Sequence, residues 1–355
     1  MSHGHSNAVS RWQTIPYWTI NFPCGDRRKT ALAICLYLIK IKVYLELCWK
    51  RNFCDYLAET EYNNYLTYIF EPTILMGVLF GLAGVAAAFH FGHLNAFFGA
   101  LAVIGAVLAQ IGVNLVDDYV DYRNGIDKES VKTKFSGGSD ALISGRINPK
   151  GILSIIVLTA LIGIGVGLYI SYFYPVVLFV IILGAISVIF YPSVIVRVPY
   201  LAEHDTMLGF TLIAIGCYLA ASGGFVTGLP SALFALLPVG MLGGIALFVN
   251  NVPDKEVDRK HGRRSMVIML WKNVPISNYY AVLEFIVYGI IVAGIALGVL
   301  SQIFLITLLS APASFKVFEG IRKYKNPKSY EKFMAIGAAQ TAAFAILVII
   351  SLIVW

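Results

Sequence analysis

The stretch NAFFGALAVIGAVLAQIGVNLVDDYVDYRNGID, residues 95–127, runs from a long apolar segment directly into a cluster of aspartates. A helix needs ~20 mostly apolar residues to span the hydrocarbon of a bilayer, and residues 95–116 meet this requirement. The carboxylates that follow belong at the membrane surface, because an ionised group in hydrocarbon is costly unless it has partners. The stretch therefore predicts a membrane-spanning helix with a charged site at its end.

Similar apolar windows recur along the rest of the chain. Hydrophobic residues make up 58% of the 355 residues, charged residues only 13%, and the mean hydropathy is +0.75. This composition excludes an ordinary soluble domain. We predict an all-α polytopic membrane protein, a bundle of nine transmembrane helices around a central cavity. Its spans are expected at 73–91, 95–116, 151–172, 174–196, 206–226, 230–251, 278–300, 301–319 and 333–354.

The basic residues predict how this bundle is oriented. All 19 Lys and Arg beyond residue 60 lie in or beside the even-numbered connections, and the odd-numbered connections are short and uncharged. By the positive-inside rule, the even-numbered connections face the cytoplasm of a cell-membrane protein. We therefore interpret the net charge of +7 as a topology signal and expect no nucleic-acid partner.

The first sixty residues differ from the rest of the chain. They hold four of the five cysteines, without the spacing of a metal site, and one apolar stretch, 32–49, that three charged residues interrupt. Such a stretch favours a helix that lies at the membrane surface over one that spans it. We predict an N-terminal extension, 1–60, followed by a transmembrane domain, 61–355.

Two windows concentrate the acids, NLVDDYVDYRNGID at 114–127 and NNVPDKEVDRKHGRRS at 250–265. At 3.6 residues per turn, each window places an asparagine and two aspartates on one helix face. The faces comprise Asn114, Asp118 and Asp121 in the first window, and Asn250, Asp254 and Asp258 in the second. Both windows end even-numbered helices, so the two clusters are expected at the same membrane face. An isolated acidic helix end could be merely solvated, but two clusters at one face predict a shared site.

Converging carboxylates repel one another unless a cation lies between them. Oxygen ligands select a hard ion such as Mg²⁺, which commonly adds phosphate oxygens to one or two carboxylates. Basic residues near the clusters are candidates to bind those phosphate oxygens: Lys132, Lys134, Arg146, Arg259, Arg263 and Arg264. Acids, metal and bases together predict a site for a diphosphate. If this diphosphate is the leaving group of an allylic prenyl chain, the apolar bundle would hold the chain and exclude water.

The paired windows resemble the signatures of the UbiA superfamily of intramembrane prenyltransferases, NxxxDxxxD and DxxxD. The forms DYxDYxxGxD from Asp118 and NNxxDxxxDxxxG(K/R)(K/R)(T/S) from Asn250 are similar to 1,4-dihydroxy-2-naphthoate prenyltransferases of menaquinone synthesis. The segment SGGSDALISGRINP at 136–149 resembles the loop that follows the first motif there. The resemblance covers about residues 66–355. It implies a nine-helix fold and transfer of a polyprenyl group from a prenyl diphosphate.

The resemblance also implies roles for individual residues. Asn114, Asp118 and Asp121 would hold one Mg²⁺ and Asp254 and Asp258 another, while Arg263 and Arg264 would bind phosphate. The motif form favours 1,4-dihydroxy-2-naphthoate as acceptor, which loses its carboxylate in the reaction. Relatives with similar metal sites use 4-hydroxybenzoate or geranylgeranylglyceryl phosphate, so these acceptors remain open.

Several other residues have two possible roles. Tyr191, Tyr200 and Asn250 are candidates to stabilise a carbocation or contact the acceptor, although tyrosines also gather at membrane interfaces without such a role. Glu203 or the neighbouring His204 could remove a proton from the acceptor, or could be an ordinary loop residue. Asp117 and Glu256 lie off the shared faces, which favours solvation or a salt bridge over metal binding. Asp127 follows Gly125, where the first motif helix should end, so a second-shell or a turn role is open.

Two other classes of membrane protein fit less well. A transporter would also carry intramembrane acids, but the sequence shows neither paired broken helices nor convincing repeated halves. A CDP-alcohol phosphotransferase also combines aspartates with Mg²⁺. Its motif requires glycine directly after DxxD, whereas Tyr122 follows Asp121 here.

Overall fold

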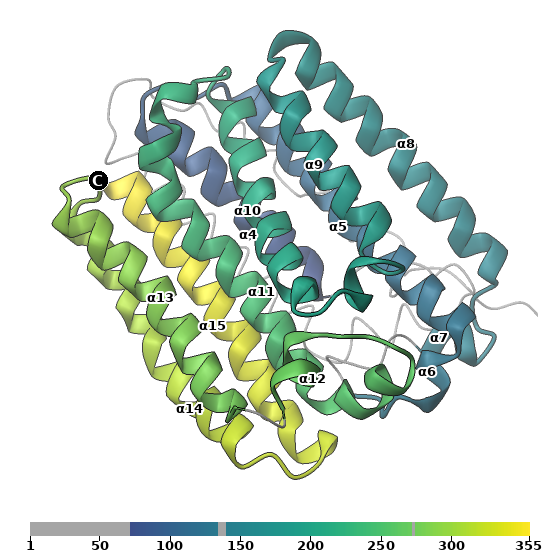
Figure 1. The fold of residues 1–355 in the computed structure, drawn as a ribbon. Coiled ribbons are helices and arrows are strands. Elements are labelled where there is room, and N and C mark those ends of the chain that lie inside the picture. Colours follow the sequence, from purple (N-terminus) through teal and green to yellow (C-terminus); the bar gives the residue numbers. More distant parts are fainter. Residues whose placement is uncertain (1–71, 134–139, 272–273) are drawn as a thin grey trace, which may run out of the picture. The chain divides into compact units, whose positions relative to one another are not determined.

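The structure, a computed structural model, describes residues 72–133, 140–271 and 274–355. The predicted N-terminal extension, 1–60, lies outside these residues. Within them the secondary structure consists of α-helices and short 3-10 helices (Figure 1). Eight helices are long and apolar enough to cross a membrane, judged by length and composition. A ninth, α9 (Val176–Phe190), is apolar but shorter.

Each predicted span corresponds to a helical segment of the described chain. The long helices are α4 (Pro72–His90), α5 (Ala96–Asn124), α8 (Pro149–Phe173), α10 (Leu201–Ala221), α11 (Leu229–Lys260), α13 (Ile276–Ala296) and α15 (Pro327–Val354). The remaining span begins as the 3-10 helix η3 (Gln302–Ser310) and continues as α14 (Ala311–Arg322). The predicted all-α membrane fold is confirmed.

The boundaries differ from the predicted windows where polar residues continue a helix. Both motif helices run past their apolar windows, α5 to Asn124 and α11 to Lys260, because the acids there are solvated or paired at the helix ends. α10 begins at Leu201, five residues before the predicted window, since Glu203 and Asp205 have hydrogen-bond partners inside the bundle. Hydropathy locates the apolar part of a helix and misses such extensions.

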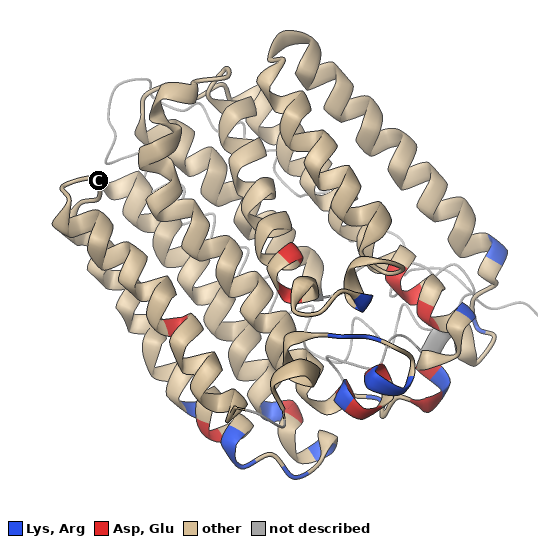
Figure 2. Ribbon diagram, in the orientation of Figure 1, with Lys and Arg blue, Asp and Glu red and all other residues tan. Residues whose placement is uncertain are grey.

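Short elements connect the long helices: α6 (Ile126–Glu129), α7 (Asp140–Ile143), η1 (Ile195–Arg197), η2 (Val226–Gly228) and α12 (Met266–Leu270). Among these, α6, α7 and α12 lie at one end of the helices, where most Lys, Arg, Asp and Glu residues of the described chain lie (Figures 1 and 2). The described connections at the opposite end, 91–95, 174–175, 222–228 and 297–301, contain none of these residues. The predicted one-sided charge distribution is therefore present in the described bundle.

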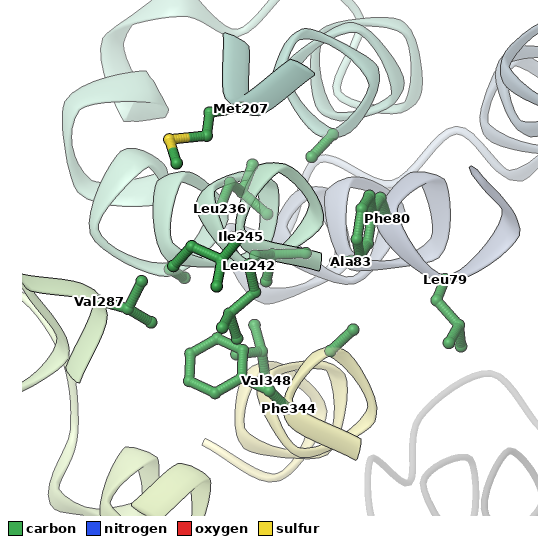
Figure 3. Packing of buried hydrophobic residues seen from close by; sticks show 14 of the residues in the cluster. Leu79, Phe80, Ala83, Met207, Leu236, Leu242, Ile245, Val287, Phe344 and Val348 are labelled. Atoms are coloured by element: carbon green, nitrogen blue, oxygen red, sulfur yellow. The ribbon is translucent and has the colours of Figure 1, made fainter. Parts of the chain in front are cut away.

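The centre of the described helices is formed by α4, α10, α11 and α15. Their apolar side chains interdigitate, as Figure 3 shows for Phe80, Leu242 and Phe344. Glycines allow α10 to approach its neighbours closely. A Cβ atom on Gly84 of α4 would lie 2.1 Å from the carbonyl oxygen of Ala214, and one on Gly240 of α11 would lie 2.1 Å from Oγ1 of Thr211. Small residues of this kind are typical of membrane helix packing, and here they fix α11 against α10.

Candidate active site

The first acidic cluster is carried by the last turns of α5. The helix continues without a break through Asn114, Asp118 and Asp121, so the predicted shared face is retained. It ends where Gly125 adopts a left-handed conformation, φ 77°, and donates its backbone N–H to carbonyl oxygens of the last turn. The predicted helix end at Gly125 is confirmed.

The second cluster lies on the last turns of α11, which reaches Lys260 and contains Asn250, Asp254 and Asp258. Asp258 is buried, whereas Asp254 and Asn250 are half-buried. The chain then turns at His261 and Gly262, where Gly262 has φ 83°. This turn directs the following residue, Arg263, back toward the acids.

The guanidinium of Arg263 joins the two clusters. Its Nη2 atom contacts Oδ1 of Asp121 and lies 3.5 Å from Oδ1 of Asp117, both on α5. Its Nη1 atom lies 3.6 Å from Oδ1 of Asp258 on α11. One planar cation therefore reaches carboxylates from both motif helices, which places the two clusters at the same end of the bundle. The salt bridge expected for Asp117 is present.

The backbone around Arg263 is held by three neighbouring segments. Arg263 N–H donates to the carbonyl of Asp258 at 2.9 Å, and Arg264 N–H to the carbonyl of Val196 at 2.8 Å. The Arg264 carbonyl accepts from Tyr200 N–H at 3.1 Å, and Met266 N–H donates to Oε2 of Glu203 at 2.9 Å. The chain that carries the arginine pair is thus fixed to the connection between α9 and α10.

The carboxylates around Arg263 stabilise its positive charge. Burial lowers the pKa of the Arg263 guanidinium, but the carboxylates of Asp117, Asp121 and Asp258 raise it by more, so its pKa lies above its usual value. Arg263 therefore stays charged. Its Nε atom is buried and, among the described residues, has no hydrogen-bond partner. One donor of the guanidinium remains available to a further ligand.

Asp127 and Glu129 on α6 extend the charged site. Asp127 is buried and lies 3.6 Å from Nζ of Lys132. Burial raises the pKa of the Asp127 carboxyl, and the Lys132 ammonium offsets only part of the rise. Glu129 accepts a 2.6 Å hydrogen bond from Nζ of Lys260, which lowers the pKa of its carboxyl. This ion pair ties α6 to the end of α11.

Three of the remaining predicted phosphate-binding residues are exposed. Arg146 is exposed and donates from Nε to Oγ of Ser144 at 3.0 Å. Arg259 pairs with Glu256, so the salt bridge expected for Glu256 is present. The side chain of Arg264 is exposed. Lys134 lies outside the described residues. The phosphate role of these bases stays a prediction.

The two predicted motif asparagines differ in their surroundings. Asn114 accepts from Nε2 of Gln110 at 3.0 Å and donates to Oγ1 of Thr73 on α4, so it fastens α5 to α4. The side chain of Asn250, on α11, is half-buried. Its neighbour Asn251, which the motif reading left without a role, donates from Nδ2 to Oε1 of Glu203 at 2.8 Å.

Glu203 is completely buried, at 0% exposed, and both of its carboxylate oxygens accept hydrogen bonds. Those bonds come from Asn251 of α11 and from the backbone N–H of Met266, the first residue of α12, so the carboxylate links α10, α11 and α12. Two tyrosines were the other candidates for the acceptor side. Tyr191 is half-buried and lies within electrostatic range of Asp117 and Arg263. Tyr200 is 41% exposed and has φ 65°, a strained conformation for a residue with a side chain.

The carboxylates at this end of the bundle fit a hard divalent cation. Oδ1 of Asp117 and Oδ2 of Asp127 are buried and accept no hydrogen bond from the described residues. In this part of the chain, no three acidic, histidine or cysteine side chains converge into a preformed metal group. Mg²⁺ needs only one or two carboxylates when phosphate and water complete its shell. The donor set therefore suits Mg²⁺ that binds together with a phosphate ligand.

A profile of the UbiA prenyltransferase family matches residues 74–351 of this chain. The 1,4-dihydroxy-2-naphthoate octaprenyltransferase of Escherichia coli (strain K12) is 27% identical over 209 residues, 57% of this chain and 66% of the relative. The match thus spans just under two thirds of that enzyme. The enzyme of the same description from Bacillus subtilis (strain 168) is 25% identical over 254 residues, 69% of this chain and 78% of the relative.

Two solved structures share the fold at 14% sequence identity, each with a TM-score of 0.58. One comes from work on digeranylgeranylglyceryl phosphate synthase, and the match covers 83% of this chain and 99% of that one. The other is the apo structure of a UbiA homolog from Aeropyrum pernix K1, with 78% and 94% covered. At this identity the likeness establishes the fold.

Proposed function

The chain belongs to the UbiA prenyltransferase family, and we propose that it transfers a polyprenyl group from a prenyl diphosphate to 1,4-dihydroxy-2-naphthoate, with Mg²⁺ as cofactor. The family and the enzyme class, a prenyltransferase, agree with the motif prediction. The acceptor follows from the motif form and from the two bacterial relatives that carry this name. Prenyl transfer to 4-hydroxybenzoate or geranylgeranylglyceryl phosphate is the alternative.

The observation that carries this proposal is the contact of one guanidinium with Asp121 of α5 and Asp258 of α11. It brings carboxylates of both motifs to one end of an apolar bundle, beside several further bases. Asn114, Asp118 and Asp121 would hold one Mg²⁺, and Asp254 and Asp258 would hold another. Mg²⁺, when bound there, supplies positive charge that makes diphosphate a better leaving group.

The side chains of the site have separate roles in the proposed reaction. The bases bind phosphate oxygens, and the apolar helices hold the prenyl tail and keep water from the reacting carbon. The proposed phosphate-binding residues are Lys132, Lys134, Arg146, Arg259, Arg263 and Arg264. The allylic C–O bond breaks and diphosphate leaves with the electron pair. The electron-rich acceptor ring forms the new C–C bond, and departure of its carboxylate as CO₂ returns an electron pair to the ring.

By the positive-inside rule, the end of the bundle that carries the site faces the cytoplasm. The enzyme would therefore take both substrates from the cytoplasmic side of the cell membrane. Tyr191 and Tyr200 lie on the connection between α9 and α10, beside the arginine segment. We assign this connection to the acceptor side of the site, because it lies beside the acids but carries none of the proposed metal ligands, which are all on α5 and α11.

Activity of the purified protein in detergent tests the proposal. The protein is incubated with polyprenyl diphosphates of several lengths and each of the three acceptors, with Mg²⁺ or with EDTA. We expect a prenylated dihydroxynaphthoate product that requires Mg²⁺ and is lost in Asp118→Asn and Asp254→Asn. Glu256→Gln is the matched control, because Glu256 is exposed and paired with Arg259. Product with only another acceptor would reassign the substrate, and metal-independent turnover would refute the mechanism.

A further inference from the structure

Arg263 contacts the same carboxylates that are expected to bind the metal. Asp121 and Asp258 lie on different helices, and the guanidinium touches Asp121 while lying 3.6 Å from Asp258. Asp117 adds a third carboxylate, 3.5 Å from Nη2. Without a cation between them, these negative charges would repel one another and push α5 and α11 apart. Arg263 supplies that cation from within the chain.

A divalent ion and a guanidinium cannot share these oxygens without strong repulsion. The exposed fractions of the side chains of Asp121 and Asp258 are only 11% and 6%, so water screens the pair weakly. Occupation by one cation therefore excludes close contact by the other. This makes Arg263 a competitor of the metal as well as a neighbour of it.

The structure allows the side chain to leave while its backbone stays in place. The segment 263–266 is held by hydrogen bonds to Val196, Tyr200, Asp258 and Glu203, none of which involves the guanidinium. The Arg263 side chain is 16% exposed, and its buried Nε donor has no partner among the described residues. A planar fork with an unused donor is well suited to phosphate oxygens.

We propose that Arg263 is an exchangeable counter-ion, which holds the two acid clusters together before substrate binds and moves to the diphosphate when metal takes its place. The proposal rests on the proposed function, because it assumes a diphosphate donor with a divalent ion. It predicts that metal and diphosphate bind together, since either alone meets an unfavourable charge: metal meets the guanidinium, and diphosphate meets the acids.

Binding of Mn²⁺, a paramagnetic substitute for Mg²⁺, tests the exchange without relying on turnover. Free Mn²⁺ is measured by electron paramagnetic resonance in a titration of the full-length protein in detergent, without diphosphate. We expect Arg263→Gln to bind Mn²⁺ about tenfold more tightly than the wild type, because the competing cation is gone. Arg264→Gln is the matched control, since it removes the same charge from the next residue, whose side chain is exposed.

A second titration measures the affinity for inorganic diphosphate in the presence of saturating Mn²⁺. Here the sign reverses: Arg263→Gln should bind diphosphate about tenfold more weakly, because the displaced guanidinium no longer helps to hold it. Arg263→Lys keeps the charge but cannot reach both helices with one planar group. It should give an intermediate Mn²⁺ affinity, and it remains informative if the glutamine variant does not fold.

Equal Mn²⁺ affinities for Arg263→Gln, Arg264→Gln and the wild type would overturn the proposal, as would weaker Mn²⁺ binding by Arg263→Gln. Failure of the proposed function gives a different pattern. If none of the offered acceptors were prenylated but the two titrations shifted in opposite directions, the exchange would stand and the acceptor assignment would fall.

Discussion

Replacement of Glu203 separates a positioning role from a catalytic one. The carboxylate is fully buried and accepts hydrogen bonds from Nδ2 of Asn251 at 2.8 Å and from the backbone N–H of Met266 at 2.9 Å. In Glu203→Ala both donors lose their acceptor inside the protein. Leaving a buried donor unsatisfied costs about 1–3 kcal/mol each, so the variant should lose about 2–6 kcal/mol of stability.

Glu203→Gln is the gentler change. It keeps one oxygen that can accept from Met266 N–H, and the side-chain amide of Asn251 can turn to present its oxygen to the new NH₂ group. We expect a loss of about 1 kcal/mol, with the segment 263–266 still in place. Its activity should stay within a few fold of the wild type, whereas a general base contributes about 10²–10⁴-fold to the rate.

The amide of Met266 reports directly on this contact. Hydrogen exchange in detergent should become about 30-fold faster at Met266 in Glu203→Ala, which corresponds to about 2 kcal/mol of lost protection. It should change little in Glu203→Gln. If Glu203→Gln lost activity by 10²-fold or more while its Met266 exchange matched the wild type, Glu203 would be the base and the positioning role would be refuted.

Three further changes test the packing that supports the site. Gly84→Ala should destabilise the protein by about 2 kcal/mol, because its Cβ would lie 2.1 Å from the carbonyl oxygen of Ala214. Gly112→Ala is the control: its Cβ would meet no atom within 4 Å among the described residues, apart from the adjacent backbone of its own helix, so thermal unfolding should be unchanged or slightly improved. Gly125→Ala should lose about 1 kcal/mol of stability in thermal unfolding, because φ 77° is strained for alanine. An unchanged unfolding midpoint would contradict the assignment of Gly125 as the cap of α5. Glu284→Leu should cost about 2 kcal/mol of stability, because the half-buried Ser314 on α14 and the buried Gln340 on α15 lose their acceptor. Glu284→Gln should cost less than half as much, and equal losses would show that the hydrogen bonds contribute little.

The helix faces and the common end of the two acid clusters were predictable because they follow from helical periodicity and from the parity of spans. Both depend on regular geometry that each motif encodes locally. α5 and α11 are continuous through their motifs, so Asp121 and Asp258 lie where the spacing predicts on each helix. The place where each helix ends was also readable at Gly125, whose conformational freedom suits a left-handed cap.

The contacts between segments were not predictable in the same way. Asp117 is one residue off the shared face, yet Arg263 approaches from another segment and reaches it beside Asp121. A loop position was one of the two interpretations of Glu203, but α10 starts before it, and its partners are Asn251 and Met266. A single sequence gives no distance between segments so far apart, and long charged side chains can turn toward partners from either side of a helix.

The arrangement of α10 explains why the charged site depends on the apolar part of the bundle. In the first turn of α10, Glu203 binds both Asn251 of α11 and the segment that follows Arg263. In the middle of the same helix, Thr211 packs directly against Gly240, so α11 cannot shift along α10 without a clash. Helix packing inside the membrane therefore sets the position of α11, and of Asp258 near its end, against α10, and a change at Gly240 should alter the acid site without touching any charged residue. Gly240→Ala should weaken Mn²⁺ binding as well as stability, and a variant that lost stability while keeping wild-type Mn²⁺ affinity would contradict this coupling.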